Sequence, residues 1–154
     1  LGNLTKATSI SMSATKVTGD IAVLGKCPGL VNAAFRHCRK ITGDIGVFAN
    51  CPGLQSAGFA FCQKIAGDIA VLGNLTKATE INMPRTDVSG DIAVLGKCPG
   101  LVNANFSYCD KITGDIKVFE QTKQLETLST EGCEELSGDK EAIKKTLPDC
   151  NFYF

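Results

Sequence analysis

The sequence predicts a repeat solenoid of the α/β type, mostly β-strand and irregular structure, in one domain of 154 residues. Two observations predict it. A Gly-Asp pair recurs six times, at intervals of 23 or 24 residues, and the residues between the pairs repeat one pattern of apolar side chains. The pairs begin at Gly19, Gly43, Gly67, Gly90, Gly114 and Gly138. A period in this range is typical of solenoids, in which each unit buries its apolar face only by stacking on its neighbours.

The Gly-Asp pairs divide the chain into units. Residues 1–18 match residues 72–89 and are therefore interpreted as a partial repeat. Complete repeats are predicted at 19–42, 43–66, 67–89, 90–113 and 114–137. Residues 138–154 begin like a repeat and then diverge, so we expect a C-terminal capping repeat there. No polar capping unit precedes the first repeat, which predicts that further repeats or a partner cover that end.

Each unit is expected to contain one short inward-facing strand. In the second unit, Ala33 and Phe35 alternate with polar or small residues, so both side chains should point into the core while Asn32 and Arg36 point outward. Stacking such units pairs the strands in parallel at a spacing of about 4.8 Å. The phenylalanines of successive units should then share one hydrophobic spine.

The rest of each unit should be a bend and a return leg. Gly43 marks a position where the backbone needs a positive φ or where a side chain would intrude. Ile45 and Val47 are expected to re-enter the core, and the Pro28-Gly29 pair should break any helix before the next strand. We therefore predict a right-handed superhelix with a concave parallel sheet and few or short 3₁₀ or α-helical turns on its convex side.

The spacing of Leu30, Ala33, Phe35 and Cys38 resembles the leucine-rich repeat, a unit that reads L-x-x-L-x-L-x-x-N/C-x-L. The resemblance covers essentially the whole chain. The ITGDI segments are similar to the plant-specific repeat type, and the CPGL and C-x-K-I-T segments are similar to the cysteine-containing type, so the chain is intermediate between the two. The resemblance implies protein–protein interaction.

A column of inward side chains is predicted after the strands. This structural ladder consists of Cys38, Cys62, Thr86, Cys109 and Cys133. The resemblance implies that such a side chain bonds nearby backbone, and a threonine hydroxyl can take the same role. Buried cysteines behave as small hydrophobes, so we expect reduced thiols and favour a reducing intracellular compartment over secretion. Disulfides between stacked turns of a secreted protein are the alternative.

Several functions are excluded by composition and motifs. Sixteen Lys and Arg residues cancel sixteen Asp and Glu residues, which argues against nucleic-acid binding, and no apolar run approaches the roughly 18 residues of a membrane span. The only histidine, His37, should face away from Cys38, and no catalytic or zinc-binding motif is present. The aspartates of the Gly-Asp pairs are expected to accept backbone N–H groups in turns; a cation bound along them is the alternative. We therefore expect no catalytic residue, cofactor, metal or small-molecule substrate.

The exposed face of the predicted sheet is the remaining candidate site. Aromatic and arginine side chains concentrate one position before the ladder, where stacking should bring them side by side; ordinary surface variation is the alternative interpretation. The predicted partner-binding residues are Arg36, His37, Phe61, Arg85, Tyr108, Asn103 and Asn105. The sequence thus predicts a non-catalytic protein–protein interaction or scaffolding module. A structural subunit of a large multi-protein assembly and a ligand-sensing ectodomain of a receptor-like protein are the alternatives.

Overall fold

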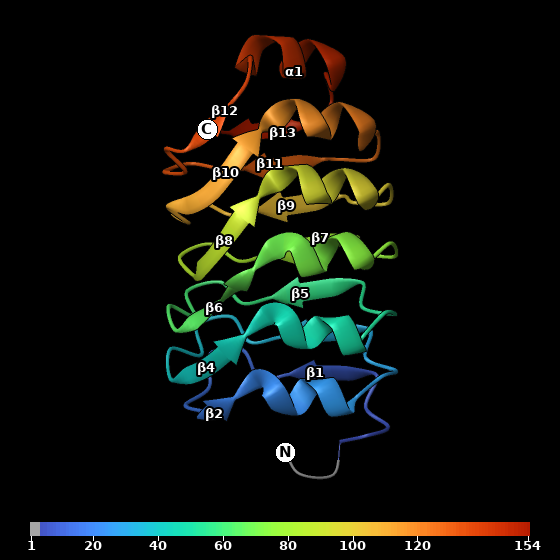
Figure 1. The fold of residues 1–154 in the computed structure, drawn as a ribbon, viewed down its shortest axis with the longest axis vertical. Coiled ribbons are helices and arrows are strands. Elements are labelled where there is room, and N and C mark those ends of the chain that lie inside the picture. The colour runs from blue at the N-terminus through green and yellow to red at the C-terminus, as the bar shows by residue number, and fades with distance from the viewer. Residues whose placement is uncertain (1–3) are drawn as a thin grey trace.

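The computed structural model describes residues 4–154 and shows coils stacked along one axis in the order of the sequence (Figure 1). One strand from each coil joins a seven-stranded parallel sheet in the order β1-β3-β5-β7-β9-β11-β13. These strands are β1 (Ser9–Ser11), β3 (Asn32–Ala34), β5 (Ser56–Gly58), β7 (Glu80–Asn82), β9 (Asn103–Asn105), β11 (Thr127–Ser129) and β13 (Asn151–Tyr153). The predicted repeat solenoid with a parallel β-sheet is confirmed.

A second parallel sheet lies where the sequence predicted only a bend. Its order is β12-β10-β8-β6-β4-β2. The strands are β2 (Gly19–Asp20), β4 (Ile41–Asp44), β6 (Ile65–Asp68), β8 (Asp87–Asp91), β10 (Lys111–Asp115) and β12 (Leu136–Ser137). The constant repeat length places these short extended segments, several of them rich in β-branched residues, beside one another, so they pair as the concave strands do.

Short 3₁₀-helices form the return leg of five coils. They are η1 (Ile21–Lys26), η2 (Ile45–Asn50), η3 (Ile69–Asn74), η4 (Ile92–Lys97) and η5 (Ile116–Gln121). An aspartate caps each one; in η2, Asp44 Oδ1 accepts the N–H of Gly46 at 2.7 Å. The aspartates of the Gly-Asp pairs therefore serve as helix caps.

The expectation that Val47 re-enters the core is met only in part, because Val47 packs against the edge of the core and Phe48 fills its interior. Val47 is half-buried, whereas Phe48 is fully buried. A 3₁₀-helix has three residues per turn, so positions i and i+3 share a face. Ile45 and Phe48 therefore face inward together, and the strand-like alternation assumed for this leg does not apply.

The last coil replaces the 3₁₀-helix with an α-helix. Helix α1 (Lys140–Thr146) begins after Asp139, whose carboxylate accepts the N–H groups of two residues in the first turn. The ammonium groups of Lys140 and Lys144 lie 5.0 and 5.8 Å from the centre of the Phe154 ring. Together with the burial of Ile143 and Leu147 in the core, these contacts join α1 to the end of the stack.

One continuous core runs the length of the solenoid. Phe35 and Phe59 stack with their ring centres 5.3 Å apart, and both belong to the same buried cluster as Phe106. Met83 fills the corresponding place in the repeat between those of Phe59 and Phe106 and is fully buried. The aligned concave strands bring these side chains into one spine, as predicted.

Candidate functional site

The backbone leaves the concave sheet in an uncommon conformation. At the same position of each turn a residue that is not glycine has a left-handed φ between 56° and 64°, and a glycine takes over in the sixth turn at 73°. The residues are Ala14, His37, Phe61, Arg85, Tyr108 and Gly132. A left-handed conformation costs about 1–2 kcal/mol for a residue with a Cβ. Its recurrence means that the surrounding structure fixes it.

Hydrogen bonds between coils hold these left-handed residues. The N–H of Phe61 donates to the carbonyl of Pro84 at 2.8 Å, and the N–H of Arg85 donates to the carbonyl of Ser107 at 2.9 Å. The N–H of Tyr108 donates in the same way to Glu131 at 2.6 Å. The side chains therefore project from backbone that is fixed by the next coil.

Four of these side chains form a stack, here called the stacked column: His37, Phe61, Arg85 and Tyr108. The rings of His37 and Phe61 lie 4.5 Å apart at an angle of 11°. The guanidinium carbon of Arg85 lies 5.9 Å from the centre of the Phe61 ring and 4.1 Å from that of Tyr108. Such cation–π contacts and ring stacks favour one arrangement of otherwise mobile surface side chains.

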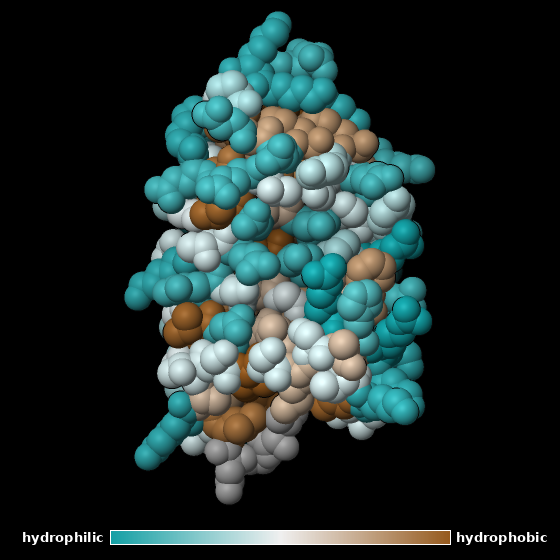
Figure 2. All heavy atoms as spheres, turned by 180° about the vertical axis from the view of Figure 1, so that it is seen from behind, coloured by the Kyte–Doolittle hydropathy of each residue, from teal (hydrophilic) through white to brown (hydrophobic). Residues whose placement is uncertain are grey.

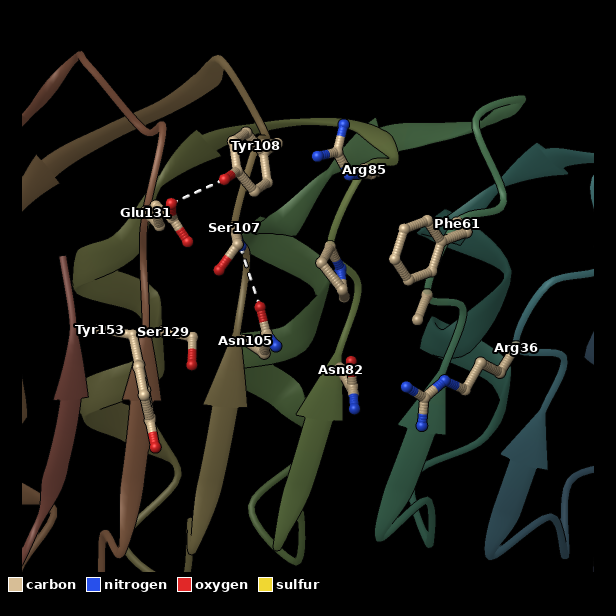
Figure 3. A pocket seen from close by; sticks show the side chains of 12 residues that line it. Arg36, Phe61, Asn82, Arg85, Asn105, Ser107, Tyr108, Ser129, Glu131 and Tyr153 are labelled. Atoms are coloured by element: carbon tan, nitrogen blue, oxygen red, sulfur yellow. Dashed lines mark hydrogen bonds between the residues drawn. The ribbon is translucent and has the colours of Figure 1, made fainter.

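The stacked column ends on a carboxylate. The hydroxyl of Tyr108 donates a hydrogen bond to Glu131 Oε1 at 2.7 Å (Figure 3). This bond to the Glu131 carboxylate raises the pKa of Tyr108 above its ordinary value, because ionisation of the phenol would lose the donor and place two negative charges together. Tyr108 therefore stays protonated and keeps donating at neutral pH.

A groove of about 440 Å³ runs beside the stacked column across the concave sheet. Its lining residues are Arg36, Ala60, Phe61, Asn82, Pro84, Arg85, Asn105, Ser107, Tyr108, Ser129, Glu131 and Tyr153. Arg36 and Glu131 hold the same repeat position at opposite ends of the groove, and small side chains hold that position between them. Seen from behind the view of Figure 1, this face mixes hydrophilic and neutral residues with isolated hydrophobic ones (Figure 2).

Polar groups from the strands complete the groove. Asn105 Oδ1 accepts the N–H of Ser107 at 3.0 Å, which orients the amide at the end of β9. Asn82 Oδ1 is buried and, within residues 4–154, has no hydrogen-bond partner. Ser129 is buried at the end of β11, and Tyr153 is 56% exposed at the end of β13. The groove therefore offers hydroxyl, amide, carboxylate, guanidinium and aromatic groups.

The structure brings five of the seven predicted partner-binding residues into the groove. They are Arg36, Phe61, Arg85, Tyr108 and Asn105. His37 lies outside the lining and contacts Phe61 through its ring, and Asn103 lies at the exposed start of β9, away from the lining. Their role in binding stays a prediction.

Other lining residues were not predicted. Glu131 shares the repeat position of Arg36, so the repeat alignment could have found it. Tyr153 lies between Phe152 and Phe154, and strand alternation places it on the outer face. Asn82, Pro84 and Ser129 are outward or strand-end positions of the sheet, but nothing in their residue types singled them out.

Within the predicted ladder, the thiols bond the preceding coil. The Sγ atoms of Cys38, Cys62, Cys109 and Cys133 donate to carbonyl oxygens of that coil at 2.9 to 3.1 Å. Thr86 differs, because its hydroxyl donates to Met83 in its own coil at 2.7 Å. A C–O bond is shorter than a C–S bond, so the hydroxyl reaches less far.

Burial raises the pKa of Cys62 and Cys133 to about 11.

Among the described residues, neither a cluster of metal ligands nor a paired His37 and Cys38 is formed. Between residues 4 and 154, no three His, Cys, Asp or Glu side chains lie close enough together to bind a metal ion. Cys38 is fully buried, whereas His37 is exposed and packs on Phe61, so the two cannot act as a Cys–His pair. No helix of that part of the chain is long and apolar enough to cross a membrane.

Comparison with known proteins gives matches only at the level of structure. No protein-family model matches the sequence, and no curated protein matches it significantly. The plant peptide hormone receptor RGFR1, solved in complex with RGF2, superposes with a TM-score of 0.76 over 99% of this chain at 23% identity. The leucine-rich-repeat protein LIC12759 of Leptospira interrogans superposes with a TM-score of 0.70 over 98% of this chain at 16% identity. The chain has the leucine-rich-repeat fold.

The chain spans less than half the length of either of these two proteins. It spans 25% of the RGFR1 chain and 38% of the LIC12759 chain. The leucine-rich-repeat ectodomain of the receptor kinase SOBIR1 from Arabidopsis thaliana is matched over 84% of this chain and 72% of its own, with a TM-score of 0.68 and 15% identity. At these identities the similarity establishes the fold.

Proposed function

We propose that the protein is a non-catalytic protein-binding module that uses the groove beside the stacked column. The observation that carries the proposal is the alignment of three exposed side chains, His37, Arg85 and Tyr108, with the half-buried Phe61. All four project from left-handed backbone fixed between coils. Aromatic and arginine side chains are the types that dominate the binding energy of protein interfaces.

Rigidity is the physical advantage of this arrangement. Immobilising a rotamer-rich side chain on binding costs about 0.5–1.5 kcal/mol. The guanidinium of Arg85 is already held 4.1 Å from the Tyr108 ring, and the Tyr108 hydroxyl is already bonded to Glu131. Part of this cost is therefore met before a partner arrives.

The comparisons support the class of function. RGFR1 is a peptide hormone receptor solved in complex with RGF2, and it has the same fold over the whole of this chain. This supports a polypeptide as the partner. We further propose that the solenoid acts as a rigid scaffold, since each coil is hydrogen-bonded to its neighbours along both sheets.

Alanine substitution in the stacked column tests the proposal. Wild type, Tyr108→Ala, Phe61→Ala and the convex-face control Lys117→Ala serve as baits in an extract of the native source, with quantitative mass spectrometry of the retained proteins. Truncation of a central interface aromatic costs about 2 kcal/mol or more, which is roughly a thirtyfold loss of affinity. A partner retained by wild type and Lys117→Ala but lost from Tyr108→Ala is the expected result. Equal retention by all four baits would contradict the proposal.

A ligand-sensing ectodomain is the second candidate. The match to the SOBIR1 ectodomain over 72% of that chain favours it. The same experiment separates the two, because a scaffold subunit is recovered at fixed stoichiometry with a large complex, whereas a sensing ectodomain is recovered with one dissociable ligand. Recovery of a fixed-stoichiometry complex would reject the ectodomain.

A further inference from the structure

The two ends of the groove carry opposite charge. Arg36 follows β3, Arg85 follows β7 and Glu131 follows β11, and all three side chains line the groove (Figure 3). Among residues 4–154, the ion pairs formed involve other residues, so neither guanidinium has a carboxylate partner. Within the described part of the chain, the Glu131 carboxylate accepts a hydrogen bond from the neutral hydroxyl of Tyr108 and has no cationic partner. Three charged groups thus face the groove without a counter-charge.

Charge is distributed along the whole molecule in the same direction as along the groove, with an excess of basic side chains toward the N-terminal end and of acidic ones toward the C-terminal end. Residues 1–60 contain six basic and two acidic side chains, whereas residues 101–154 contain six basic and ten acidic ones. In a solenoid the sequence position sets the height along the axis (Figure 1). The field along the axis therefore reinforces the groove charges and orients an approaching partner that is itself charged at both ends.

The spacing of the three charges selects a backbone conformation. Adjacent strands lie about 4.8 Å apart, and Arg36, Arg85 and Glu131 follow every second strand of the sheet. The charged levels are therefore about 9.6 Å apart. A polyproline II helix advances about 3.1 Å per residue with three residues per turn, or about 9.3 Å per turn. Side chains at i, i+3 and i+6 of such a helix lie on one face at this spacing.

A β-strand fits the charges less well. Three residues of extended strand also cover about 10 Å, but side chains at i and i+3 of a strand point to opposite faces. The residues that line the groove also favour a polyproline II segment over a β-strand, because polyproline II segments dock in grooves lined by aromatic rings. Phe61, Tyr108 and Tyr153 supply the rings here, and the small Ala60 and Ser107 leave room between them.

We propose that the groove binds a polyproline II segment of a partner protein with acidic side chains at positions i and i+3 and a basic side chain at i+6. The acidic groups bind Arg36 and Arg85, and the basic group binds Glu131. The inference rests on the proposed function and specifies the chemistry of the partner segment. The guanidinium of Arg85, held 4.1 Å from the centre of the Tyr108 ring, supplies N–H donors of the kind that bind a carboxylate with two parallel hydrogen bonds.

Synthetic peptides test the spacing directly. The probe is acetyl-Asp-Pro-Pro-Asp-Pro-Pro-Lys-amide, and the matched control, acetyl-Asp-Pro-Asp-Pro-Pro-Pro-Lys-amide, has the same composition with the second carboxylate displaced. Titration is followed by amide NMR shifts of the isotope-labelled protein. An exposed ion pair changes affinity by up to about fivefold, so the probe should bind several times more tightly than the control and shift groove amides. Equal affinities, or no binding of the probe, would overturn the proposal.

Charge variants test which end binds which group. With Arg36→Glu the preference should switch to acetyl-Lys-Pro-Pro-Asp-Pro-Pro-Lys-amide, by about tenfold relative to wild type. Glu131→Gln keeps an acceptor for Tyr108 and should abolish the preference for lysine over serine at the last peptide position. Circular dichroism of both variants checks that the fold is intact. An unchanged preference in folded Arg36→Glu would refute the assignment.

The outcome is separable from that of the proposed function. If Tyr108→Ala loses the native partner while the peptides bind without preference for spacing, the groove is a protein-binding site and the polyproline II inference is wrong. If the probe binds with the expected preference while Tyr108→Ala retains the native partner, the binding chemistry holds and the proposed role of the stacked column in partner binding fails.

Discussion

Replacing Gly67 with alanine tests how the bends of the solenoid are built. Gly67 has a φ of 120°, which a residue with a Cβ rarely adopts. An added Cβ would collide with Asp44 Oδ1 and lie 2.9 Å from Asp44 Cγ and 3.0 Å from Ile45 Cγ1. The same carboxylate caps η2 through its bond to the N–H of Gly46. The substitution therefore affects both the backbone and the cap of the preceding coil.

The magnitude follows from these two effects. A residue held in a sparsely populated backbone region costs about 1–3 kcal/mol. Displacing the capping carboxylate costs about a further 1 kcal/mol. Gly67→Ala should therefore lower the free energy of unfolding by about 2–4 kcal/mol.

Urea unfolding followed by circular dichroism measures the effect. Gly29→Ala is the matched control, because an added Cβ at Gly29 meets no atom within 4 Å and its φ is not positive. That substitution should stabilise the protein by about 0.4–1 kcal/mol through the unfolded chain. A Gly67→Ala midpoint at or above that of wild type would refute this account of the bend.

Three further predictions concern the ladder and the core. Thr86→Cys should raise the free energy of unfolding in urea by about 0.5–1 kcal/mol, because the longer thiol reaches the preceding coil; an unchanged midpoint would contradict this. The thiols of Cys62 and Cys133 should resist a thiol reagent in the native protein at about pH 8, and stability should fall as pH rises from 9.0 to about 11, because the unfolded thiols ionise first. Rapid native labelling would show that they are not buried. Phe48→Ala should cost about 3–5 kcal/mol in thermal unfolding, whereas Val47→Ala should cost less, and the reverse order would reject the 3₁₀ geometry.

The repeat made most of the fold predictable. Once the Gly-Asp pairs set the period, Phe35 and its counterparts had to share a core, and the thiols that follow the strands had to lie in register. The second sheet and the burial of the Phe48 side chain were not predictable from strand alternation. They depend on the 3₁₀-helix and on short extended segments whose pairing only the stacked coils create.

The candidate site was predictable in part for the same reason. Alignment placed His37, Phe61, Arg85 and Tyr108 in one column before any contact was known. It could not give the left-handed backbone, because these residue types carry no signal for it and the hydrogen bonds between coils impose it. Glu131 was not singled out because its importance lies in one side-chain bond to Tyr108.

Site-specific photo-cross-linking tests the central claim most directly. A photoreactive amino acid replaces either Asn105, which lines the groove, or Ala93, which is exposed on the convex η4. Each variant is irradiated in an extract of the native source. The account predicts a cross-link to a partner protein from position 105 and none from position 93. A partner cross-linked from position 93 alone would contradict it.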